Sequence, residues 1–445
     1  MNICVINGSP RGKYSTTLQT VLYLEKRFPR HRFEVVNVGT RISTLEKEMG
    51  EALAALSHAE LILFSYPVYT FLAPSQLHRF IAALKKADID LSGKYATQIT
   101  TSKHFYDVTA HRYVEDNCFD LSLRVIRGLS ADMEDLLSEK GRAQAEAFFE
   151  YALWCVQNGV YEPAPVRERL ALPEYTRALP ETPKRDGFDT VIVADLRADD
   201  ARLKAMIDDF TASFPYKTRL VNIAEYPFQG GCLGCFHCAG DGKCVYKDGF
   251  DTFLRDQIQT ADAIVYAFSI RDHSMGPTFK IYDDRQFCNG HRTVTEGMPF
   301  MYIVSGDYRS EDNLRTVIEA RCEVGGNFLC GVGFDGDTLA AAGKRLAYAL
   351  NTGYVQPRNF YGVGGMKIFR DLIWMMRGLM KADHQFYKAH GVYDFPQKQR
   401  LKMVKMCFLG ALVRSPKVKA KMGNKLNEGM TAPYEKVLRA AKAKE

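Results

Sequence analysis

The sequence has no apolar run long enough to cross a membrane, and we expect no secretion leader. None of its 445 residues belongs to a stretch that approaches the ~20 apolar residues of a spanning helix. Residues 1–6 begin at once as a strand, without the basic residues and apolar stretch of a signal peptide. We therefore expect a cytoplasmic protein with eleven cysteines in a reducing compartment, where thiols serve metal binding or redox chemistry rather than structural disulfides.

Charge of one sign is in excess only near the C-terminal end. Hydrophobic residues at 46% and charged residues at 25% are typical of a soluble globular protein, and the length favours two to three domains. Residues 366–445 contain 18 Lys and Arg against 6 Asp and Glu, a net charge of +12, whereas the whole chain carries +7. A mildly acidic body therefore precedes a basic tail.

The first loop lacks both the Gly-Lys-Ser/Thr ending of a Walker loop and the pattern Gly-x-Gly-x-x-Gly. We expect a short buried strand over residues 2–8 and a helix over 16–27. Between them, Gly8–Thr17 is rich in small and hydroxyl residues. Free N–H groups at a helix N-terminus favour an anion, and hydroxyls add hydrogen bonds. The pattern indicates a phosphate cradle, the alternative being an ordinary turn with a capping Ser.

Further apolar strands alternate with helices, which predicts a parallel, doubly wound sheet. A helix is expected near 44–57. The run Leu61–Phe64 is expected to be a central strand that leads into Ser65–Thr70, and the strand at 95–101 is expected to end in the polar, aromatic loop Thr101–Asp107. In such sheets ligands bind beyond the carboxyl ends of the strands. Three strand ends thus carry loops suited to one ligand.

These loops resemble those of the NADPH-dependent FMN reductase family of flavodoxin-like proteins. The resemblance rests on Gly8-Ser-Pro-Arg, Ser15-Thr16, Pro67-Val-Tyr-Thr and Gln76-Leu77, while Tyr14-Ser15 stands where the family commonly has Asn. It implies an NAD(P)H-dependent FMN oxidoreductase. The residues that would face the FMN phosphate are Ser9, Arg11, Ser15, Thr16 and Thr17. Those that would face the flavin ring are Pro67, Val68, Tyr69, Thr70, Thr101 and Ser102.

The strand pattern occurs a second time. The segments Thr190–Asp195, Thr218–Ile223 and Ala261–Ala267 are similar to the first three strands. This repeat predicts an α/β protein of two flavodoxin-like, doubly wound parallel-sheet domains in tandem, with a basic helical tail. The predicted boundaries are 1–160 for the FMN-binding domain, 161–186 for a proline-rich linker, 187–357 for the second domain and 358–445 for the tail.

The two halves differ in the loops that would hold a flavin. Asp195–Asp200 supplies three carboxylates where the first half has Gly-Ser-Pro-Arg, and carboxylates at a helix N-terminus would repel a phosphate. Ser269–Arg271 replaces the Pro-Val-Tyr loop. The second half alone contains four cysteines within thirteen residues, namely Cys232, Cys235, Cys238 and Cys244.

This cysteine stretch resembles that of iron–sulfur flavoproteins, in which four thiolates hold a [4Fe–4S] cluster, and the resemblance implies that role for these four. Bacterial ferredoxins have a shorter last gap and a following proline, whereas Val245 follows here. A zinc site and a metal-free thiol or disulfide motif stay open. His237 is expected to face solvent or to lie beside a sulfur instead of being a ligand, and Cys288, Cys322 and Cys330 are expected to be buried thiols without a role.

Two polar motifs and the basic tail each allow two interpretations. Asp272-His273 and Asp283–Arg285 could be catalytic, but we expect loop and helix-surface residues there. The tail has apolar stretches at 366–380 and 401–413 among Lys and Arg. We expect helices packed on the second domain, the alternative being an interfacial helix pair that meets anionic lipid or an acidic partner. No nucleic-acid partner is expected.

Together these features predict electron transfer between a nicotinamide or protein donor, FMN, the [4Fe–4S] cluster and a small-molecule or protein acceptor. The two halves are expected to face each other as an intramolecular pseudo-dimer, and a further homodimer stays open. Two alternative functions also stay open. One is an NAD(P)H-dependent quinone, nitro or azo reductase without a cluster, and the other is a non-enzymatic electron carrier that docks a partner through its tail.

Overall fold

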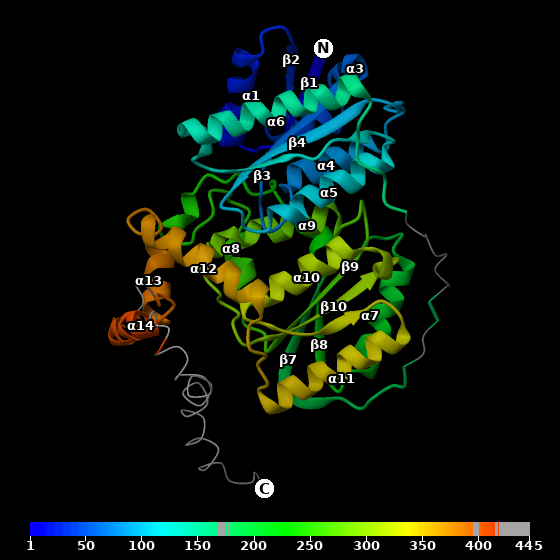
Figure 1. Cartoon of the computed structure of the whole chain (residues 1–445). Helices are drawn as coiled ribbons and strands as arrows, with labels where there is room; N and C mark the ends of the chain where they lie inside the picture. The colour runs from blue at the N-terminus through cyan, green and yellow to red at the C-terminus, as the bar shows by residue number, and fades with distance from the viewer. Residues whose placement is uncertain (167–174, 177–178, 395–399, 414–416, 418–445) are drawn as a thin grey trace. The chain divides into compact units, whose positions relative to one another are not determined.

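A computed structural model describes residues 1–166, 175–176, 179–394, 400–413 and 417. The chain divides into two compact units, Met1–Phe386 and Tyr387–Glu445, and each is described by itself. The first unit contains two parallel sheets flanked by helices (Figure 1). Part of the expected linker lies outside the described residues, and the strand that follows it begins at Arg185.

The first sheet is the predicted doubly wound one. Its strands are β1 (Asn2–Asn7), β2 (Arg32–Val36), β3 (Leu61–Pro67), β4 (Tyr95–Ser102), β5 (Arg124–Val125) and β6 (Leu129–Asp132). Their order is β2-β1-β3-β4-β5, with β6 beside β4, and every pair is parallel. Strand β3 is buried at six consecutive positions, as a central parallel strand covered on both faces requires.

The helices of the first half are α1 (Thr16–Arg27), α2 (Val38–Leu45), α3 (Gly50–His58), α4 (Ser75–Leu84), α5 (Asp107–Asp120) and α6 (Glu139–Asn158), with 3-10 turns η1 (Gly12–Tyr14) and η2 (Asp135–Leu137). Helix α1 begins as predicted, because the Ser15 hydroxyl accepts the Leu18 N–H at 3.3 Å. The helix predicted near 44–57 is present only from Gly50 onward, as α3, and its predicted start is wrong. The chain turns after Leu45 and restarts at Gly50, so that α2 and α3 each bury an apolar face.

The second sheet consists of β7 (Arg185–Ala194), β8 (Tyr216–Asn222), β9 (Ala263–Ser269), β10 (Pro299–Ser305) and β11 (Phe328–Gly333). Its helices are α7 (Ala201–Ser213), α8 (Phe250–Phe253), α9 (Gly276–Arg285), α10 (Asp312–Gly325) and α11 (Gly336–Thr352). Shorter turns are η3 (Ile223–Glu225), η4 (His237–Ala239), η5 (Leu254–Ile258), η6 (Gln286–Asn289) and η7 (Tyr308–Ser310). From β8, the strand order β8-β7-β9-β10-β11 matches that of the first sheet.

An unusual turn follows the third strand of both sheets. After β3, the first and last residues of Tyr69–Leu72 exchange backbone hydrogen bonds of 2.8 and 3.0 Å, and the two middle residues have φ values of 43° and 72°. After β9, Arg271–Ser274 forms the same turn with bonds of 2.9 and 3.0 Å and φ values of 52° and 62°. Non-glycine residues rarely adopt positive φ. The shared turn therefore supports a tandem repeat of one unit.

Each sheet has its own apolar core, and the halves meet through equivalent helices. Helix α4 packs against α9, and α5 packs against α10. The Asn313 side chain donates to the Thr109 carbonyl at 3.0 Å, and the Asn117 side chain donates to the Asp272 carbonyl at 3.2 Å. Side-chain amides thus satisfy backbone groups across the interface, which fixes the register of the two halves.

His273 is buried at this interface rather than being the plain loop residue expected. Its two ring nitrogens lie 2.9 Å from carboxylate oxygens of Asp120 and Glu311, one from each half. Burial alone would lower the pKa of His273, but the hydrogen bonds and charges of the two carboxylates outweigh it and raise the pKa to about 9. A protonated imidazole therefore bridges the halves at neutral pH.

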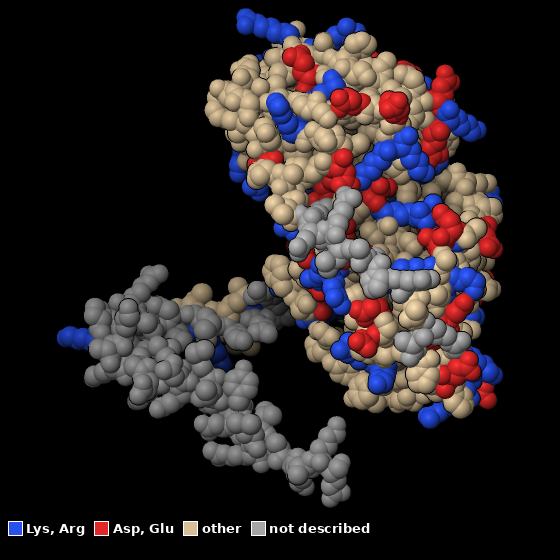
Figure 2. Space-filling view, turned by 90° about the vertical axis from the view of Figure 1, so that its right-hand side faces the viewer, with Lys and Arg blue, Asp and Glu red and all other residues tan. Residues whose placement is uncertain are grey.

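The tail begins with α12 (Phe360–Met375) and α13 (Lys381–Ala389), and α14 (Arg400–Val413) belongs to the second unit. Helix α12 packs along α10 and comes close at Gly365, where a Cβ would lie 2.7 Å from Phe105. Most of the strongly basic stretch after 413 lies outside the described residues. No helix in the part of the chain that the structure describes is long and apolar enough to span a membrane. Acidic and basic side chains are interspersed over the face in Figure 2.

Candidate active site

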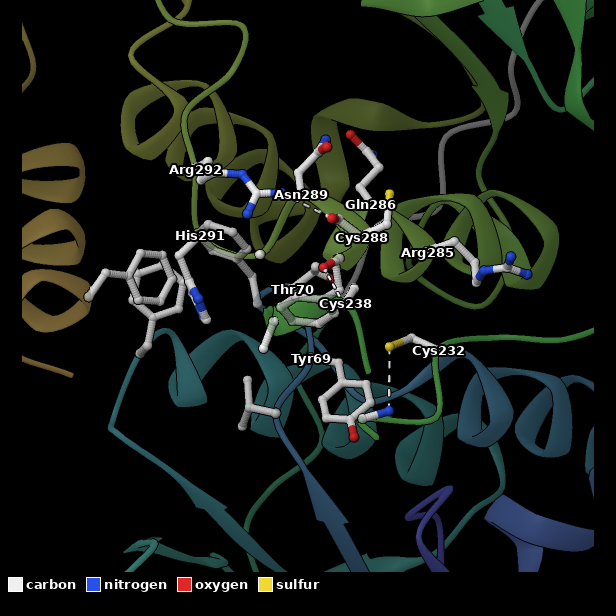
Figure 3. A pocket seen from close by; sticks show the side chains of 18 of the residues that line it. Tyr69, Thr70, Cys232, Cys238, Arg285, Gln286, Cys288, Asn289, His291 and Arg292 are labelled. Atoms are coloured by element: carbon white, nitrogen blue, oxygen red, sulfur yellow. Dashed lines mark hydrogen bonds between the residues drawn. The ribbon is translucent and has the colours of Figure 1, made fainter. Parts of the chain in front are cut away.

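One cavity of about 410 Å³ lies between the two halves of the first unit, within the size range of ligand sites. All eleven residues predicted to face FMN line it, namely Ser9, Arg11, Ser15, Thr16, Thr17, Pro67, Val68, Tyr69, Thr70, Thr101 and Ser102. All four cysteines of the predicted cluster line it as well, namely Cys232, Cys235, Cys238 and Cys244. Figure 3 shows the part of this cavity around Tyr69 and Cys232. The structure thus brings together two groups that are far apart in the sequence.

The phosphate-type loop is shaped by hydrogen bonds within its own wall. The Asn7 side chain accepts the Ser9 N–H at 3.3 Å, and the hydroxyls of Thr17 and Thr101 lie 2.7 Å apart. Ser9 and Ser15 are buried, whereas Arg11 is exposed at the rim. The N-terminus of α1 opens at this loop, so unpaired N–H groups, buried hydroxyls and one guanidinium are available to an anion.

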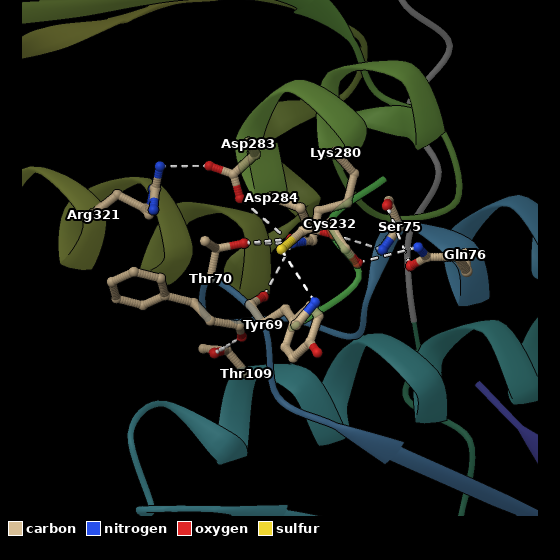
Figure 4. A network of polar contacts seen from close by, with 12 residues as sticks. Tyr69, Thr70, Ser75, Gln76, Thr109, Cys232, Lys280, Asp283, Asp284 and Arg321 are labelled. Carbon is tan, nitrogen blue, oxygen red and sulfur yellow. Dashed lines mark hydrogen bonds and ion pairs between the residues drawn. The ribbon is translucent and has the colours of Figure 1, made fainter. Parts of the chain in front are cut away.

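The turn after β3 is held by a buried charged network from α9 (Figure 4). Lys280 and Asp284 have no solvent exposure and form an ion pair. Lys280 Nζ donates to the Tyr69 carbonyl at 3.0 Å and to the Thr70 hydroxyl at 2.5 Å. Asp284 accepts the Thr70 hydroxyl at 2.8 Å and the Ser75 N–H at 2.7 Å. The second half therefore fixes the loop on which a flavin ring would rest.

The prediction that Asp283, Asp284 and Arg285 are helix-surface residues is wrong, because all three are buried. Helix α9 is covered by α4 of the first half, so this part of it faces protein instead of solvent. Asp283 pairs with Arg321 at 2.5 Å, and Arg321 itself lines the cavity. Polar residues of α9 therefore support the cavity wall from behind.

Arg285 is an anchor of the cysteine loop that sequence reasoning missed. It donates to the Gly230 carbonyl at 3.0 Å and pairs with Asp248 at 2.7 Å. Its guanidinium also lies 4.4 Å from the centre of the Tyr246 ring, within cation–π range. These contacts hold the two ends of the cysteine loop to α9. No local pattern marks Arg285, since Asp248 and Gly230 lie 37 and 55 residues earlier.

The cysteine loop lies directly against the turn after β3. The Gln76 side chain donates to the Cys232 carbonyl at 3.2 Å. Gly234 has φ of +60°, and a Cβ at this position would overlap the Tyr69 hydroxyl, so the loop needs glycine here. The Gly234 N–H points at the Cys232 sulfur at 3.4 Å. Such N–H bonds to sulfur tune ligated thiolates in metal sites.

The four sulfurs share the cavity but are not drawn together as a ligand set. Cys238 Sγ donates to the Phe287 carbonyl at 3.1 Å. Burial raises the pKa of the Cys238 thiol to about 11 and also raises the pKa of Cys232, so both are protonated at neutral pH. Among the residues with described placement, no three His, Cys, Asp or Glu are gathered to hold a metal ion. The loop has soft donors without their coordination geometry.

The remaining thiols and His237 lie largely as expected. His237 is exposed, and Cys322 and Cys330 are buried outside the cavity. Cys288 is also buried, but it lines the cavity beside the cysteine loop, which its sequence context did not indicate. Burial raises the pKa of Cys288 to about 12, and Arg292 donates to its carbonyl at 3.2 Å.

Another part of the wall is aromatic. The Phe287 ring meets the Tyr69 ring edge-on at 5.6 Å, and the His291 ring lies 4.4 Å from the Phe369 ring. Phe369 belongs to α12, whose Leu372 also lines the cavity. The apolar stretch at 366–380 is evident in the sequence, but nothing in it shows that one face would close a cavity. This wall suits a flat, apolar ring.

The second half has an ion pair where the first half has its phosphate-type loop. Arg271 donates to both carboxylate oxygens of Asp200 at 2.9 and 3.0 Å, and the Ser269 hydroxyl donates to Asp200 at 3.0 Å. Asp200 immediately precedes α7, as Ser15 precedes α1. A carboxylate of the chain thus occupies the helix N-terminus where a phosphate would bind. The three carboxylates predicted to repel a phosphate thus include one that is ion-paired at this helix N-terminus.

Comparison with known proteins finds a similar family for the first part of the chain. Residues 1–125 match the family model described as NADPH-dependent FMN reductase. A search of curated proteins finds no match. A putative quinone reductase from Klebsiella pneumoniae is 14% identical, over 39% of this chain and 91% of that chain, with a TM-score of 0.28. An FMN-dependent NADH-azoreductase from Bacillus anthracis, in complex with FMN, is 13% identical over 36% and 99% of the two chains, with a TM-score of 0.27.

The family match covers the phosphate-type loop, the turn after β3 and the end of β4. These are the three strand ends that line the cavity from the first half. Both sheets have the doubly wound order of flavodoxin-like proteins. The chain therefore has a flavodoxin-like fold, and its residues 1–125 are similar to the NADPH-dependent FMN reductase family.

Proposed function

We propose that this protein is an FMN-dependent NAD(P)H oxidoreductase with its flavin bound between the two halves. The observation that carries the proposal is the shared cavity, because the residues expected to hold FMN and the four cysteines line it together. The family of residues 1–125 supports both the flavin and the nicotinamide donor. The second half, whose equivalent loop is filled by Asp200 and Arg271, would hold no flavin of its own.

The chain's own residues would bind and orient the flavin. The buried hydroxyls of Ser9 and Ser15 and the first N–H groups of α1 would donate to the FMN phosphate, and Arg11 would add a positive charge. The flavin ring would rest on Pro67–Thr70, with Thr101-Ser102 beside it. No side chain has to act as a covalent catalyst, since the protein positions the cofactor and excludes water.

We further propose that Cys232, Cys235, Cys238 and Cys244 hold a [4Fe–4S] cluster. Four soft donors on one cavity wall and the sulfur-directed N–H of Gly234 fit this group. Ligation would require each thiol to lose its proton and the loop to tighten around the metal. When bound, FMN supplies hydride chemistry and a cluster supplies one-electron transfer. Zinc would use the same thiolates.

A second candidate is an NAD(P)H-dependent reductase of quinone, nitro or azo compounds whose cysteines hold no metal. The Cys238 thiol already has a partner within the protein, since its Sγ donates to the Phe287 carbonyl at 3.1 Å, and this contact favours the second candidate. The aromatic wall formed by Phe287, His291 and Phe369 would then take the acceptor. A third candidate, a carrier without catalysis, would hold FMN but would not turn over NAD(P)H.

Anaerobic purification followed by absorption spectroscopy and by flavin, iron, sulfide and zinc analysis tests these proposals. We expect about one FMN per chain and about four iron and four sulfide. Cys235→Ser is expected to lose iron while FMN stays, and Cys407→Ser, at another exposed cysteine, is the matched control. Protein with zinc in place of iron would overturn the cluster. Protein that binds no FMN would overturn the oxidoreductase, and bound FMN without NAD(P)H turnover would favour the carrier.

A further inference from the structure

Helix α12 has an inner face that closes the cavity. Phe369 and Leu372 line the cavity, and Ile373 on the same side is fully buried. Gly365, also on this side, packs closely against Phe105. Residues three and four apart share one face of a helix, so the opposite side of α12 points away from the cavity.

The outer face of α12 and the turn after it are apolar and exposed. Phe360 is 86% exposed, Met375 is 56% exposed and Leu379 is 57% exposed, and Val363 and Trp374 retain 43% and 42%. Single exposed apolar residues are common on soluble proteins. Five of them along one helix face and the turn that follows form a patch, and such patches mark interaction surfaces.

Basic side chains accompany this patch. Lys367 is exposed on the same face, and Arg377 lies over the ring of Trp374 at 4.9 Å. Lys381 begins the next helix. Residues 366–381 contain four Lys and Arg and a single acid, Asp371. Asp371 is exposed on this face too, but it pairs with Arg370 at 2.8 Å. The outer face therefore combines an apolar surface with an excess of positive charge from Lys367, Arg377 and Lys381.

We propose that the outer face of α12 binds the surface of a membrane that contains anionic lipids. An interfacial helix places apolar side chains at the acyl boundary and cations among the headgroups, which is the combination found here. Tryptophan is favoured at that boundary because its ring is apolar and its N–H is polar. An acidic protein would attract the cations but would not require Phe360, Met375 and Leu379 to be exposed.

The second unit, taken by itself, has the same character. In α14, Leu401, Val404 and Phe408 are 79%, 67% and 68% exposed. Lysines occur at positions 402 and 405, and residues 366–445 together carry a net charge of +12. An anionic membrane surface attracts such basic segments within about one Debye length. Both parts of the tail thus fit one partner.

Membrane binding through α12 would bring lipid close to the cavity. The inner face of this helix lines the cavity, so the bilayer surface would lie about 10 Å from it, the diameter of one helix. An apolar electron acceptor dissolved in the lipid would then enter the cavity on the side of the aromatic wall, which includes Phe369 of α12. The inference stands apart from the proposed function, because binding to vesicles requires neither FMN nor a cluster.

The two tryptophans of the chain permit a direct test. Trp154→Phe, a change on α6, leaves Trp374 as the only tryptophan. Vesicles that contain phosphatidylglycerol are expected to shift its emission to shorter wavelength, and brominated acyl chains are expected to quench it. Lys367→Gln is expected to lower the partition coefficient about fivefold, since one cation near an anionic surface contributes about that factor.

Vesicle flotation with paired variants completes the test. Leu379→Glu is expected to lose flotation, whereas Leu137→Glu, at an 81% exposed leucine of the first half, is expected to float like wild type. Unshifted and unquenched Trp374 emission with anionic vesicles would overturn the proposal. Equal partition into vesicles of pure phosphatidylcholine and into vesicles with phosphatidylglycerol would overturn the proposed preference for anionic lipid. Salt-sensitive binding to polyglutamate with none to vesicles would assign this face to an acidic protein instead.

Discussion

Lys280→Met is expected to destabilise the wall of the cavity that carries the turn after β3. Methionine keeps the length of the side chain but removes the charge that neutralises Asp284. Asp284 would then be a fully buried carboxylate beside Asp283 without its cationic partner. Breaking a buried ion pair in this way costs about 3–5 kcal/mol. For a domain of this size the melting temperature is expected to fall by roughly 6–20 °C.

The size of this loss should depend on pH. Burial raises the pKa of Asp284 and Lys280 opposes that rise, so the pKa is higher still without the lysine. A carboxyl group with a raised folded pKa destabilises the fold fully above that folded pKa, and the penalty shrinks to zero as the pH falls from the folded to the unfolded pKa. Lys280→Met is therefore expected to regain stability relative to wild type as the pH is lowered from about 8 to about 5.

Thermal unfolding by circular dichroism, together with release of FMN fluorescence, measures both effects. Adding Asp284→Asn to Lys280→Met is expected to restore part of the stability, and the double-mutant cycle gives the coupling energy. Lys204→Met is the matched control, because Lys204 and Asp208 form an exposed pair at the same helical spacing. That change is expected to cost at most about 1 kcal/mol. A Lys280→Met protein that melts like the Lys204→Met control and keeps its FMN would refute this reasoning.

Three further predictions concern the cavity and the interface. Ser15→Ala removes a buried hydroxyl at the N-terminus of α1 and is expected to weaken FMN binding about tenfold in a fluorescence titration, with unchanged binding counting against the phosphate site. Gly234→Ala is expected to lower the FMN content of purified protein, whereas Gly364→Ala, in open space, is not. Because its folded pKa is raised to about 9, His273 stabilises the interface fully below about pH 6.5, and about 3 kcal/mol is lost as pH rises through about 9. Melting curves of wild type and His273→Gln that change equally between about pH 6 and 10 would contradict this role.

The loops of the cavity could be predicted from the sequence because each depends on local signals. Ser15 and Tyr69 follow apolar strands, and the carboxyl ends of neighbouring parallel strands meet at one edge of a sheet. The spacing of the four cysteines is likewise local. Neither the FMN-type loops nor the cysteine stretch contains a signal that the two would lie against each other. It follows from the packing of α4 on α9, and only the three-dimensional arrangement of two whole halves decides that contact.

The supporting network could not be predicted for a related reason. Lys280 and Asp284 are spaced like a surface pair on an exposed helix. What makes them a buried anchor is Thr70 and Ser75, more than two hundred residues earlier. The same holds for His273, whose pKa depends on a carboxylate from each half. The burial of a charged residue can be inferred only from the groups that pair with it. When those groups are distant in the chain, the sequence contains no periodic pattern that would indicate them.

The cavity is lined by two halves of one polypeptide, and this matters when the protein is dilute. A site shared by separate subunits comes apart below their dissociation constant, whereas a covalent connection keeps the effective concentration of one half near the other in the millimolar range. Occupancy and turnover per chain should therefore be independent of protein concentration. In a symmetric homodimer every substitution occurs in both subunits, whereas here a substitution in the cavity wall occurs once. Tyr69 on one side and Gly234 on the other can thus change separately, without a symmetry-related copy of either change elsewhere in the molecule.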